Sequence, residues 1–179
     1  MNILLHICCA NCAIFPVKVL REQNQNVTGF FFNPNIHPYQ EFRRRLETVE
    51  TYAAKVELEV IYQRDYLLEE FLAQVAATPM TRCDYCYQSR LAQTARVAAD
   101  GGFDAFSTSL LYSRYQQHDR IHEYGKQLAS HYGIQFVYQD FRQGWRKGIE
   151  ASKAMGLYRQ QYCGCIYSEK DRYCPQQRN

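Results

Sequence analysis

Long hydrophobic runs are missing from this 179-residue sequence, although 46% of its residues are hydrophobic. No apolar stretch approaches the roughly 20 residues that a membrane-spanning helix needs. The first residues enter an apolar segment directly, with neither the basic flank nor the small-residue cleavage site of a signal peptide. We therefore expect a cytoplasmic protein, in which thiols stay reduced and clustered cysteines indicate metal or redox chemistry more often than structural disulfides.

Glycine is missing from the turn after the first apolar segment. Nucleotide-dependent tRNA thiolation enzymes carry a phosphate loop of the Ser-Gly-Gly-x-Asp-Ser type at that place, whereas this chain has Cys8-Cys9-Ala10-Asn11-Cys12. We therefore exclude this class of enzyme. A strong excess of one charge is missing too, because 21 Lys and Arg residues stand against 18 Asp and Glu residues. The net charge of +3 neither indicates nor excludes an RNA partner.

Apolar segments and helical periodicities alternate along the chain and predict an α/β fold. The expected strands cover 3–7, 27–32, 58–62, 103–110 and 134–138, and the expected helices cover 13–23, 40–56, 66–77, 84–99, 117–132 and 144–155. This alternation predicts a mostly parallel, five-stranded, Rossmann-like sheet with helices on both faces. We expect a single domain over 1–170 and a polar tail over 171–179, in which Cys174 is a bystander.

Cysteine is the residue type around which the chain is organised. Seven of the eight cysteines fall into three tight groups, which are Cys8, Cys9 and Cys12, then Cys83 and Cys86, then Cys163 and Cys165. The first group occupies a strand-to-helix turn. In an open α/β sheet such a turn lies at the carboxyl ends of the strands, where ligands bind. We predict that the fold brings the three groups together around iron.

The Cys83-Asp84-Tyr85-Cys86 motif suits a metal site at the start of a helix. Residues three apart share one helical face, and a helix N-terminus favours thiolate. A thioredoxin-like redox pair is an alternative, but such a pair follows the first strand of its fold and this one follows the third. A zinc site could use these two cysteines with Cys9 and Cys12, which would leave three cysteines unexplained. A four-iron, four-sulfur cluster accepts more varied spacing and is modestly favoured.

The Cys163-Gly164-Cys165 segment suits redox chemistry better than metal binding. Two cysteines with one residue between them are too close to ligate one cluster comfortably. A dithiol that cycles with a disulfide is the more natural use, and Gly164 supplies the backbone freedom for it.

Basic residues near the C-terminal cysteines form a candidate RNA-binding track. The track consists of four residues, Arg142, Arg146, Lys147 and Arg159, with Lys153 beside them, and it is flanked by Tyr158 and by Trp145, the only tryptophan. Basic side chains contact phosphates and aromatic rings stack on unpaired bases, which is how anticodon loops are usually recognised.

Other charged segments are expected to lie at the surface. Arg43-Arg44-Arg45 falls in an expected helix that also carries Glu41 and Glu47, which predicts a mixed-charge surface. His118 and His122 have helical spacing but no third ligand nearby, so we expect them on a solvated helix face.

Five segments together resemble the QueH-type epoxyqueuosine reductases over about residues 3–170. They are His6-Ile7-Cys8-Cys9-Ala10-Asn11-Cys12, Phe32-Asn33-Pro34-Asn35-Ile36-His37-Pro38, Arg82-Cys83-Asp84-Tyr85-Cys86, Asp140-Phe141-Arg142 and Tyr158-Arg159-Gln160-Gln161-Tyr162-Cys163-Gly164-Cys165. One departure is Asn11, where that family more usually has proline, and we expect it to affect only the stiffness of the turn. The resemblance implies removal of the epoxide oxygen of epoxyqueuosine, a modified base at the wobble position of tRNA, to give the cyclopentene of queuosine.

The resemblance also implies cofactors and site residues. It implies a four-iron, four-sulfur cluster on Cys8, Cys9, Cys83 and Cys86, a redox-active pair at Cys163 and Cys165, and a further metal ion beside the cluster. Cys12 is the leading candidate ligand for that second metal, iron or zinc, and Asp84 is a further candidate. The partners would be tRNA carrying epoxyqueuosine and an external electron donor, with no need for cobalamin.

The implied chemistry fits the residues that are present. Deoxygenation of an epoxide needs two electrons, two protons and a group that holds the departing oxygen. An iron–sulfur cluster delivers single electrons, a nearby metal acts as a Lewis acid, and a dithiol supplies two electrons and two protons. The alternative is a non-catalytic, zinc-stabilised RNA-binding domain, which would have no use for Cys163 and Cys165.

Overall fold

The computed structural model describes residues 1–174, and its centre is a five-stranded sheet. The strands are β1 (Asn2–His6), β2 (Asn26–Phe31), β3 (Val60–Tyr62), β4 (Ala105–Thr108) and β5 (Gln135–Phe136). They lie in the order β3-β2-β1-β4-β5, and every neighbouring pair is parallel. The predicted α/β fold with a parallel Rossmann-like sheet is confirmed.

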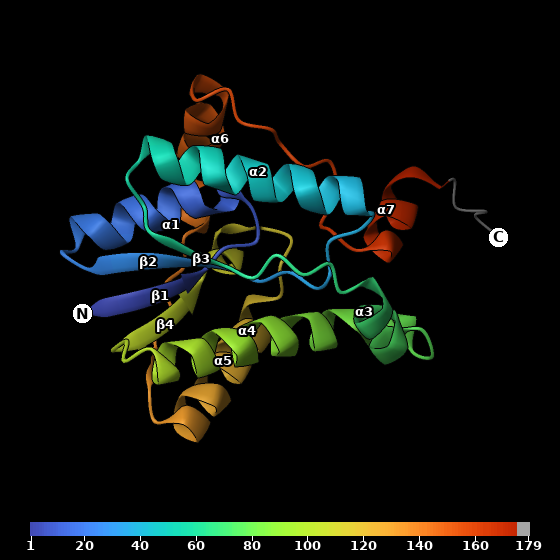
Figure 1. The fold of residues 1–179 in the computed structure, drawn as a ribbon, viewed down its shortest axis with the longest axis horizontal. Coiled ribbons are helices and arrows are strands. Elements are labelled where there is room, and N and C mark those ends of the chain that lie inside the picture. Colours follow the sequence, from blue (N-terminus) through green and yellow to red (C-terminus); the bar gives the residue numbers. More distant parts are fainter. Residues whose placement is uncertain (175–179) are drawn as a thin grey trace.

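Helices cover both faces of this sheet. They are α1 (Ala10–Glu22), α2 (Tyr39–Lys55), α3 (Leu68–Val75), α4 (Arg82–Asp100), α5 (His118–Tyr132), α6 (Trp145–Ala154) and α7 (Ile166–Tyr173), with short 3-10 turns η1 (Pro79–Thr81), η2 (Ser109–Tyr112) and η3 (Arg142–Gly144). Helices α1, α2 and α6 lie on one side of the sheet, and α4 and α5 lie on the other (Figure 1). Within residues 1–174, no helix is both long enough and apolar enough to span a membrane.

Burial on both faces explains the composition of the central strand. β1 pairs with β2 on one edge and with β4 on the other, and Ile3, Leu4 and Leu5 expose no surface. A strand in this position carries a continuous apolar run because neither of its faces meets water. The apolar side of α2 faces the core as predicted, since Phe42 and Val49 are buried in it.

Several elements differ from the predicted ranges, and β4 and α7 show the physical reasons. β4 ends at Thr108, earlier than expected, because the Thr108 hydroxyl accepts a hydrogen bond from the Leu110 amide (3.2 Å) and starts η2. The sequence pattern does not predict α7, and residues 171–173, expected in the polar tail, belong to it. α7 has no buried residue and therefore no apolar period to recognise. Residues 175–179 of the expected tail lie outside the described residues.

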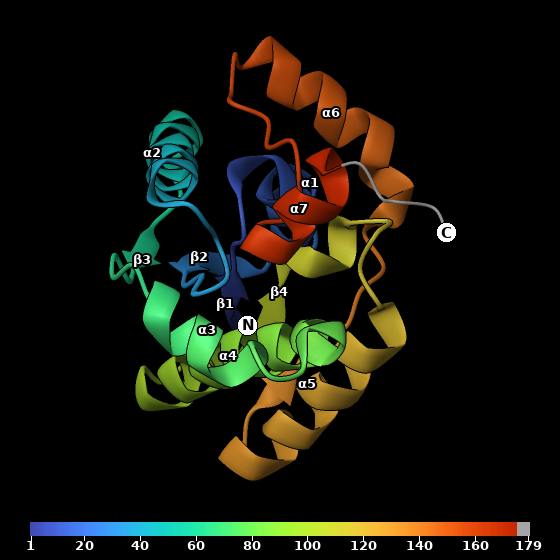
Figure 2. The ribbon, with the colours of Figure 1, turned by 90° about the vertical axis from the view of Figure 1, so that its right-hand side faces the viewer.

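The strand order places a crevice at the carboxyl ends of β1 and β4. From β1 the chain builds outward through β2 and β3 and then returns to the opposite edge of β1 as β4. Such a reversal is where α/β proteins bind ligands. Cys8 follows β1 and Ser109 follows β4 at this end of the sheet. Figure 2 looks onto that end, with α7 in front.

Candidate functional site

A triad of thiols stands at the carboxyl end of β1. Cys8 lies in the turn after the strand, Cys9 is the N-cap residue of α1, and Cys12 lies in the first turn of that helix. Their sulfur atoms all lie within 4.8 Å of one another. The turn folds this way because the Ile7 amide still donates to the Phe30 carbonyl (2.8 Å), and helix α1 begins three residues later. The triad can therefore hold a metal ion.

Hydrogen bonds distribute charge unequally over the triad. The pKa of Cys8 is held well below its usual range, because the thiols of Cys12 and Cys9 hydrogen-bond to its sulfur. The pKa of Cys12 is raised because it donates to Cys8, and burial raises the pKa of Cys9. Within the triad, negative charge is therefore most favourable on Cys8. A bound metal would favour the deprotonated form of all three, since thiolate is the ligand form.

Two polar side chains touch the sulfur atoms of the triad. The Ser109 hydroxyl donates to Cys8 Sγ (3.4 Å), and the Gln160 amide lies 2.9 Å from Cys9 Sγ and 3.7 Å from Cys12 Sγ. Gln160 is oriented by Asn11, whose Nδ2 donates to Gln160 Oε1 (2.9 Å) and to the Tyr158 carbonyl (2.9 Å). The expectation that Asn11 affects only the stiffness of the turn is wrong, because its side chain ties the segment before Cys163 to the triad.

The second pair of thiols lies at the start of α4. Cys83 is half-buried and Cys86 is buried, and burial raises the pKa of Cys86 to about 12. Negative charge on Cys163 and Cys165 acts in the same direction on both thiols, so the C-terminal pair lies within electrostatic reach of α4. Among the described residues, the sulfur atoms that lie close enough to share one metal ion are those of Cys8, Cys9 and Cys12, and the sulfur atoms of Cys83 and Cys86 do not belong to this group.

A buried arginine links α4 to the triad. Arg90 is only 2% exposed, and its guanidinium donates to Cys86 Sγ (2.9 Å) and to the Cys86 carbonyl (3.0 Å). Its charge interacts favourably with Cys86 first and then with Cys8. Sequence reasoning missed this residue, although an Arg four positions after a Cys on one helix was the available signal. A permanent cation at this position favours negative charge on the surrounding sulfur atoms.

The Cys163-Gly164-Cys165 segment is fixed by backbone contacts from α2 and the loop before it. The guanidinium of Arg45 donates to the carbonyls of Cys163 (2.7 Å) and Tyr162 (2.9 Å), and the His37 amide donates to the Gly164 carbonyl (2.9 Å). The space at Gly164 is tight, since a Cβ there would lie 3.1 Å from Asn35 Nδ2 and 3.2 Å from the Asn35 carbonyl oxygen. Cys163 is exposed and Cys165 is buried, and the seven cysteines of the three groups are free thiols.

Arg45 contradicts the mixed-charge surface expected for Arg43-Arg44-Arg45. The Arg45 side chain is 2% exposed, and it forms an ion pair of 2.7 Å with Glu41, which is 8% exposed. Arg43 and Glu47 form an ion pair of the same length on the same helix, but their side chains are 65% and 55% exposed. The helical period puts Glu41 and Arg45 on the side of α2 that also buries Phe42. The buried pair is tolerated because the carbonyls of residues 162 and 163 satisfy the rest of the guanidinium.

Replacing Arg45 should therefore destabilise the protein severely. Arg45→Met removes the cation beside the buried Glu41 carboxylate, which keeps only the Tyr158 hydroxyl as a donor, and it removes the donor of two carbonyls. The loss should cost about 3–5 kcal/mol of unfolding free energy. Urea unfolding followed by circular dichroism measures it. Arg43→Met, which removes an equally short but exposed pair on the same helix, is the control and should change stability little. Equal losses in both variants would show that the buried pair does not anchor the segment.

A cleft of about 840 Å³ joins the first and third cysteine groups. It opens beside α1, α6 and the segment before Cys163, and its lining includes Cys8, Cys12, Arg90, Arg159, Gln160 and Cys163. A ligand in this cleft can meet the triad and the exposed thiol of the C-terminal pair at the same time. The predicted convergence of the cysteine groups is therefore visible for the first and third of them.

The predicted RNA-binding residues do not share one environment. Arg159 lines the cleft, and Arg146 and Lys147 are exposed on α6. Arg142 is held by the Asp140 carboxylate at 2.6 Å, and its guanidinium lowers the pKa of Asp140 to about 2. The role of the four residues in RNA binding stays a prediction.

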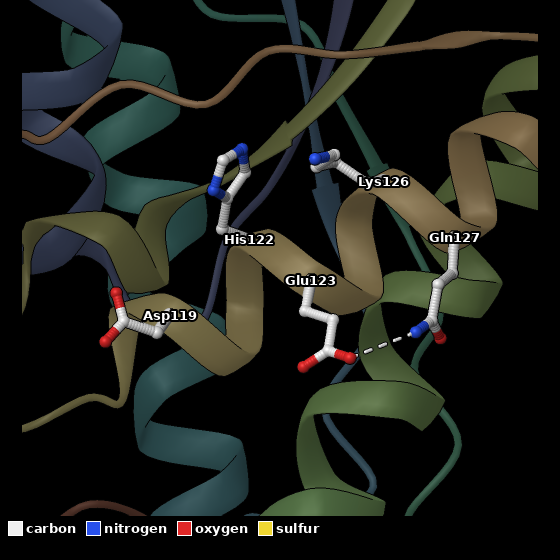
Figure 3. A pocket seen from close by; sticks show the side chains of 5 residues that line it. All are labelled: Asp119, His122, Glu123, Lys126 and Gln127. Atoms are coloured by element: carbon white, nitrogen blue, oxygen red, sulfur yellow. Dashed lines mark hydrogen bonds between the residues drawn. The ribbon is translucent and has the colours of Figure 1, made fainter.

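Asp84 and the two spaced histidines lie outside the thiol triad. Asp84 forms an ion pair with Arg120 of α5, which lowers the pKa of the carboxyl, and it also accepts from the Tyr124 hydroxyl (3.3 Å). His118 is buried and bonded to the Ser113 carbonyl (3.2 Å), so the expected solvated face is wrong for this residue. The shallow hollow beside His122 is lined by α5 alone and by no cysteine (Figure 3).

A family model and two curated relatives that match this chain carry the same description. A family model for "Epoxyqueuosine reductase QueH" matches residues 3–171. The Epoxyqueuosine reductase QueH of Dehalococcoides mccartyi is 39% identical over 172 residues, which cover 96% of this chain and 94% of that protein. The protein of the same description from Thermotoga maritima is 34% identical and covers 96% of this chain and 92% of its own length.

A solved structure of another protein has a similar fold. It is described as a predicted subunit of tRNA methyltransferase from Methanocaldococcus jannaschii, and it superimposes with a TM-score of 0.55 over 86% of this chain and 74% of that one. The sequence identity is 13%, so the likeness concerns the fold alone.

Proposed function

The chain belongs to the QueH family of epoxyqueuosine reductases, and from this premise we propose that it reduces epoxyqueuosine in tRNA to queuosine. The observation that carries the proposal is the cleft in which Cys8, Cys12 and Cys163 face one space. A reductive site needs its electron source and its substrate within contact of each other, and in this cleft thiols that would bind metal and a thiol that would be redox-active face one space.

The donor set fits the proposed cofactors. Five buried or half-buried thiols from the first two groups offer only sulfur, the ligand type that iron–sulfur clusters use. Cys8, Cys9, Cys83 and Cys86 would hold the four-iron, four-sulfur cluster, and Cys12 would ligate the second metal. When bound, these groups would supply single electrons and polarise the epoxide oxygen. Arg90, bonded to Cys86 and interacting with Cys8, supports the inclusion of α4 in this site.

The dithiol balances the reaction by itself. Both C–O bonds of the epoxide break, the carbon atoms form the alkene, and the oxygen leaves as water with the two thiol protons. The S–S bond that forms between Cys163 and Cys165 accounts for the two electrons. An external reductant then returns the disulfide to the dithiol. The exposed Cys163 faces the cleft in which the substrate would bind, whereas Cys165 is buried and would form the disulfide with Cys163.

Several side chains would hold this arrangement in place. Arg45 fixes the backbone of Cys163, and Gln160 donates to the triad from the same segment. Arg90 supplies positive charge beside sulfur atoms that must carry negative charge in the active protein. None of these contacts requires a cobalamin site, and we propose a cobalamin-independent reductase.

Anaerobic purification tests the proposal at its first step. Protein reconstituted with iron and sulfide should be brown, with the broad visible absorption of thiolate-bound iron–sulfur clusters, and should convert epoxyqueuosine to queuosine in tRNA when a chemical reductant is supplied. Iron and acid-labile sulfide are measured on the same sample. The Cys174→Ser variant is the control, since Cys174 lies outside the three groups. A colourless protein that binds one zinc and no iron would instead support a zinc-stabilised RNA-binding domain.

A further inference from the structure

An exposed aromatic group stands at the mouth of the cleft. Tyr115 is 84% exposed, and its ring meets the edge of Trp145 at a centroid distance of 5.9 Å and an angle of 77°. Trp145 is stacked in turn on Tyr112 at 5.2 Å and 27°. All three rings line the same cleft as Cys8 and Cys163. The aromatic group therefore belongs to the opening through which a substrate must enter.

Hydrogen bonds hold the Tyr112 ring and the backbone of Tyr115. The Tyr112 hydroxyl donates to the Trp145 carbonyl at the start of α6 (2.9 Å), and the Tyr115 amide donates to the Ser113 hydroxyl (3.2 Å). The Arg114 guanidinium lies over the Trp145 ring at 5.7 Å. Tyr112 and Trp145 are packed against each other before a ligand arrives, which reduces the conformational entropy lost on binding.

The charges around the opening suit a polyanion. Arg114 stands beside the rings, and Arg159 and Arg172 line the cleft. Asp171 also lines it, but the carboxylate is paired with Arg82 at 2.5 Å. Flat rings next to guanidinium groups are the combination that binds single-stranded nucleic acid, with stacking on bases and ionic contacts to phosphates.

Resting on the proposed function, we propose that Tyr115 and Trp145, with Arg114, form a stacking platform for an anticodon-loop base next to the wobble nucleotide. The wobble base must leave its stack to enter the cleft, and its neighbour then loses a stacking partner. The exposed face of Tyr115 replaces that partner. Stacking tolerates any base, so the platform would serve different anticodons equally.

The single tryptophan makes the platform directly observable. Titrating the anaerobic holoprotein with an unmodified anticodon stem–loop RNA should change the fluorescence of Trp145, and the anisotropy of dye-labelled RNA gives the dissociation constant. Tyr115→Ala should weaken binding about 5-fold to 150-fold, the equivalent of one stacked base. Tyr115→Phe keeps a ring and should bind like wild type.

A matched control separates stacking from a general loss of surface. Tyr39 is 54% exposed at the start of α2 and is paired edge-on with Tyr66, outside the cleft. Tyr39→Ala should leave both the affinity and the fluorescence change intact. Wild-type affinity in Tyr115→Ala would overturn the platform, as would an unchanged Trp145 signal on saturation with RNA.

The outcome for the platform is distinguishable from that for the reductase. Tyr115→Ala should raise KM for tRNA by a larger factor than it lowers kcat, because it removes a binding contact and leaves the thiols untouched. A different result would overturn the platform. If Tyr115→Ala bound RNA fully but turned over more slowly, and only with a protein as the reductant, the rings would dock the electron donor and not the RNA. A wild-type protein that binds the stem–loop but reduces no epoxyqueuosine would refute the proposed function and leave the platform standing.

Discussion

Serine at Cys163 or at Cys165 should leave the iron content and the visible spectrum of the protein unchanged while multiple-turnover epoxide reduction falls by about two orders of magnitude or more. Each variant lacks one of the two thiols that give up protons and electrons, and a misplaced or missing proton donor alone costs about 10²–10⁴ in rate. Neither variant can close an intramolecular disulfide. Iron analysis, spectroscopy and steady-state assays on the same samples measure the effect.

The structure adds an order of reactivity to this prediction. Cys163 is exposed and faces the cleft, where Gln116 Nε2 lies 3.5 Å from its sulfur, whereas Cys165 is buried beside Phe71 and Val75. Iodoacetamide should therefore modify Cys163 before Cys165 in the reduced protein, as read by mass spectrometry.

The competing view places one of these thiols in the metal site. It has a physical basis, because charge on Cys163 and Cys165 reaches Cys83 and Cys86. Under that view the matching serine variant loses iron before any assay is run. If Cys163→Ser or Cys165→Ser loses as much iron as Cys83→Ser, the assignment of Cys163 and Cys165 as a redox pair is wrong.

Local sequence patterns were enough to predict the strand, the turn and the sheet edge that position the thiols of this site. The apolar run of β1 and the cysteines after it specify a strand-to-helix turn, and the alternation of elements specifies a parallel sheet whose carboxyl edge holds that turn. Positions three apart on α4 place Cys83 and Cys86 on one helical face. These features depend on neighbours in sequence, which a single sequence displays.

The side chains that organise the thiols could not be found in the same way. Arg45 bonds carbonyls 117 and 118 positions away, and Asn11 bonds Tyr158 at a separation of 147. Nothing near Arg45 in sequence distinguishes it from Arg43, which is exposed on the same helix. Helix α7 escaped prediction for a related reason, since its start is set by the Cys165 N-cap and not by an apolar period.

Replacing one of the proposed cluster ligands should have the second large effect, a loss of iron and of turnover. If Cys8, Cys9, Cys83 and Cys86 hold the cluster, Cys86→Ser should lose most of the iron and all turnover, because a hydroxyl is a poor substitute for a soft thiolate. The fold should survive, since a serine hydroxyl can still accept the hydrogen bond from Arg90. Circular dichroism and urea unfolding check that point.

Cys12→Ser is the variant that decides between two ligand sets. Cys12 is one of the three thiols whose sulfur atoms lie within 4.8 Å, whereas Cys86 is outside that group. A cluster held by Cys8, Cys9, Cys83 and Cys86 predicts that Cys12→Ser keeps the visible absorption and loses at most the second metal. A metal held by the triad alone predicts the reverse, with full iron loss in Cys12→Ser and none in Cys86→Ser. Iron, sulfide and spectra of the two variants, reconstituted side by side with Cys174→Ser, separate these outcomes, and the assignment of Cys83 and Cys86 fails if Cys86→Ser retains its iron.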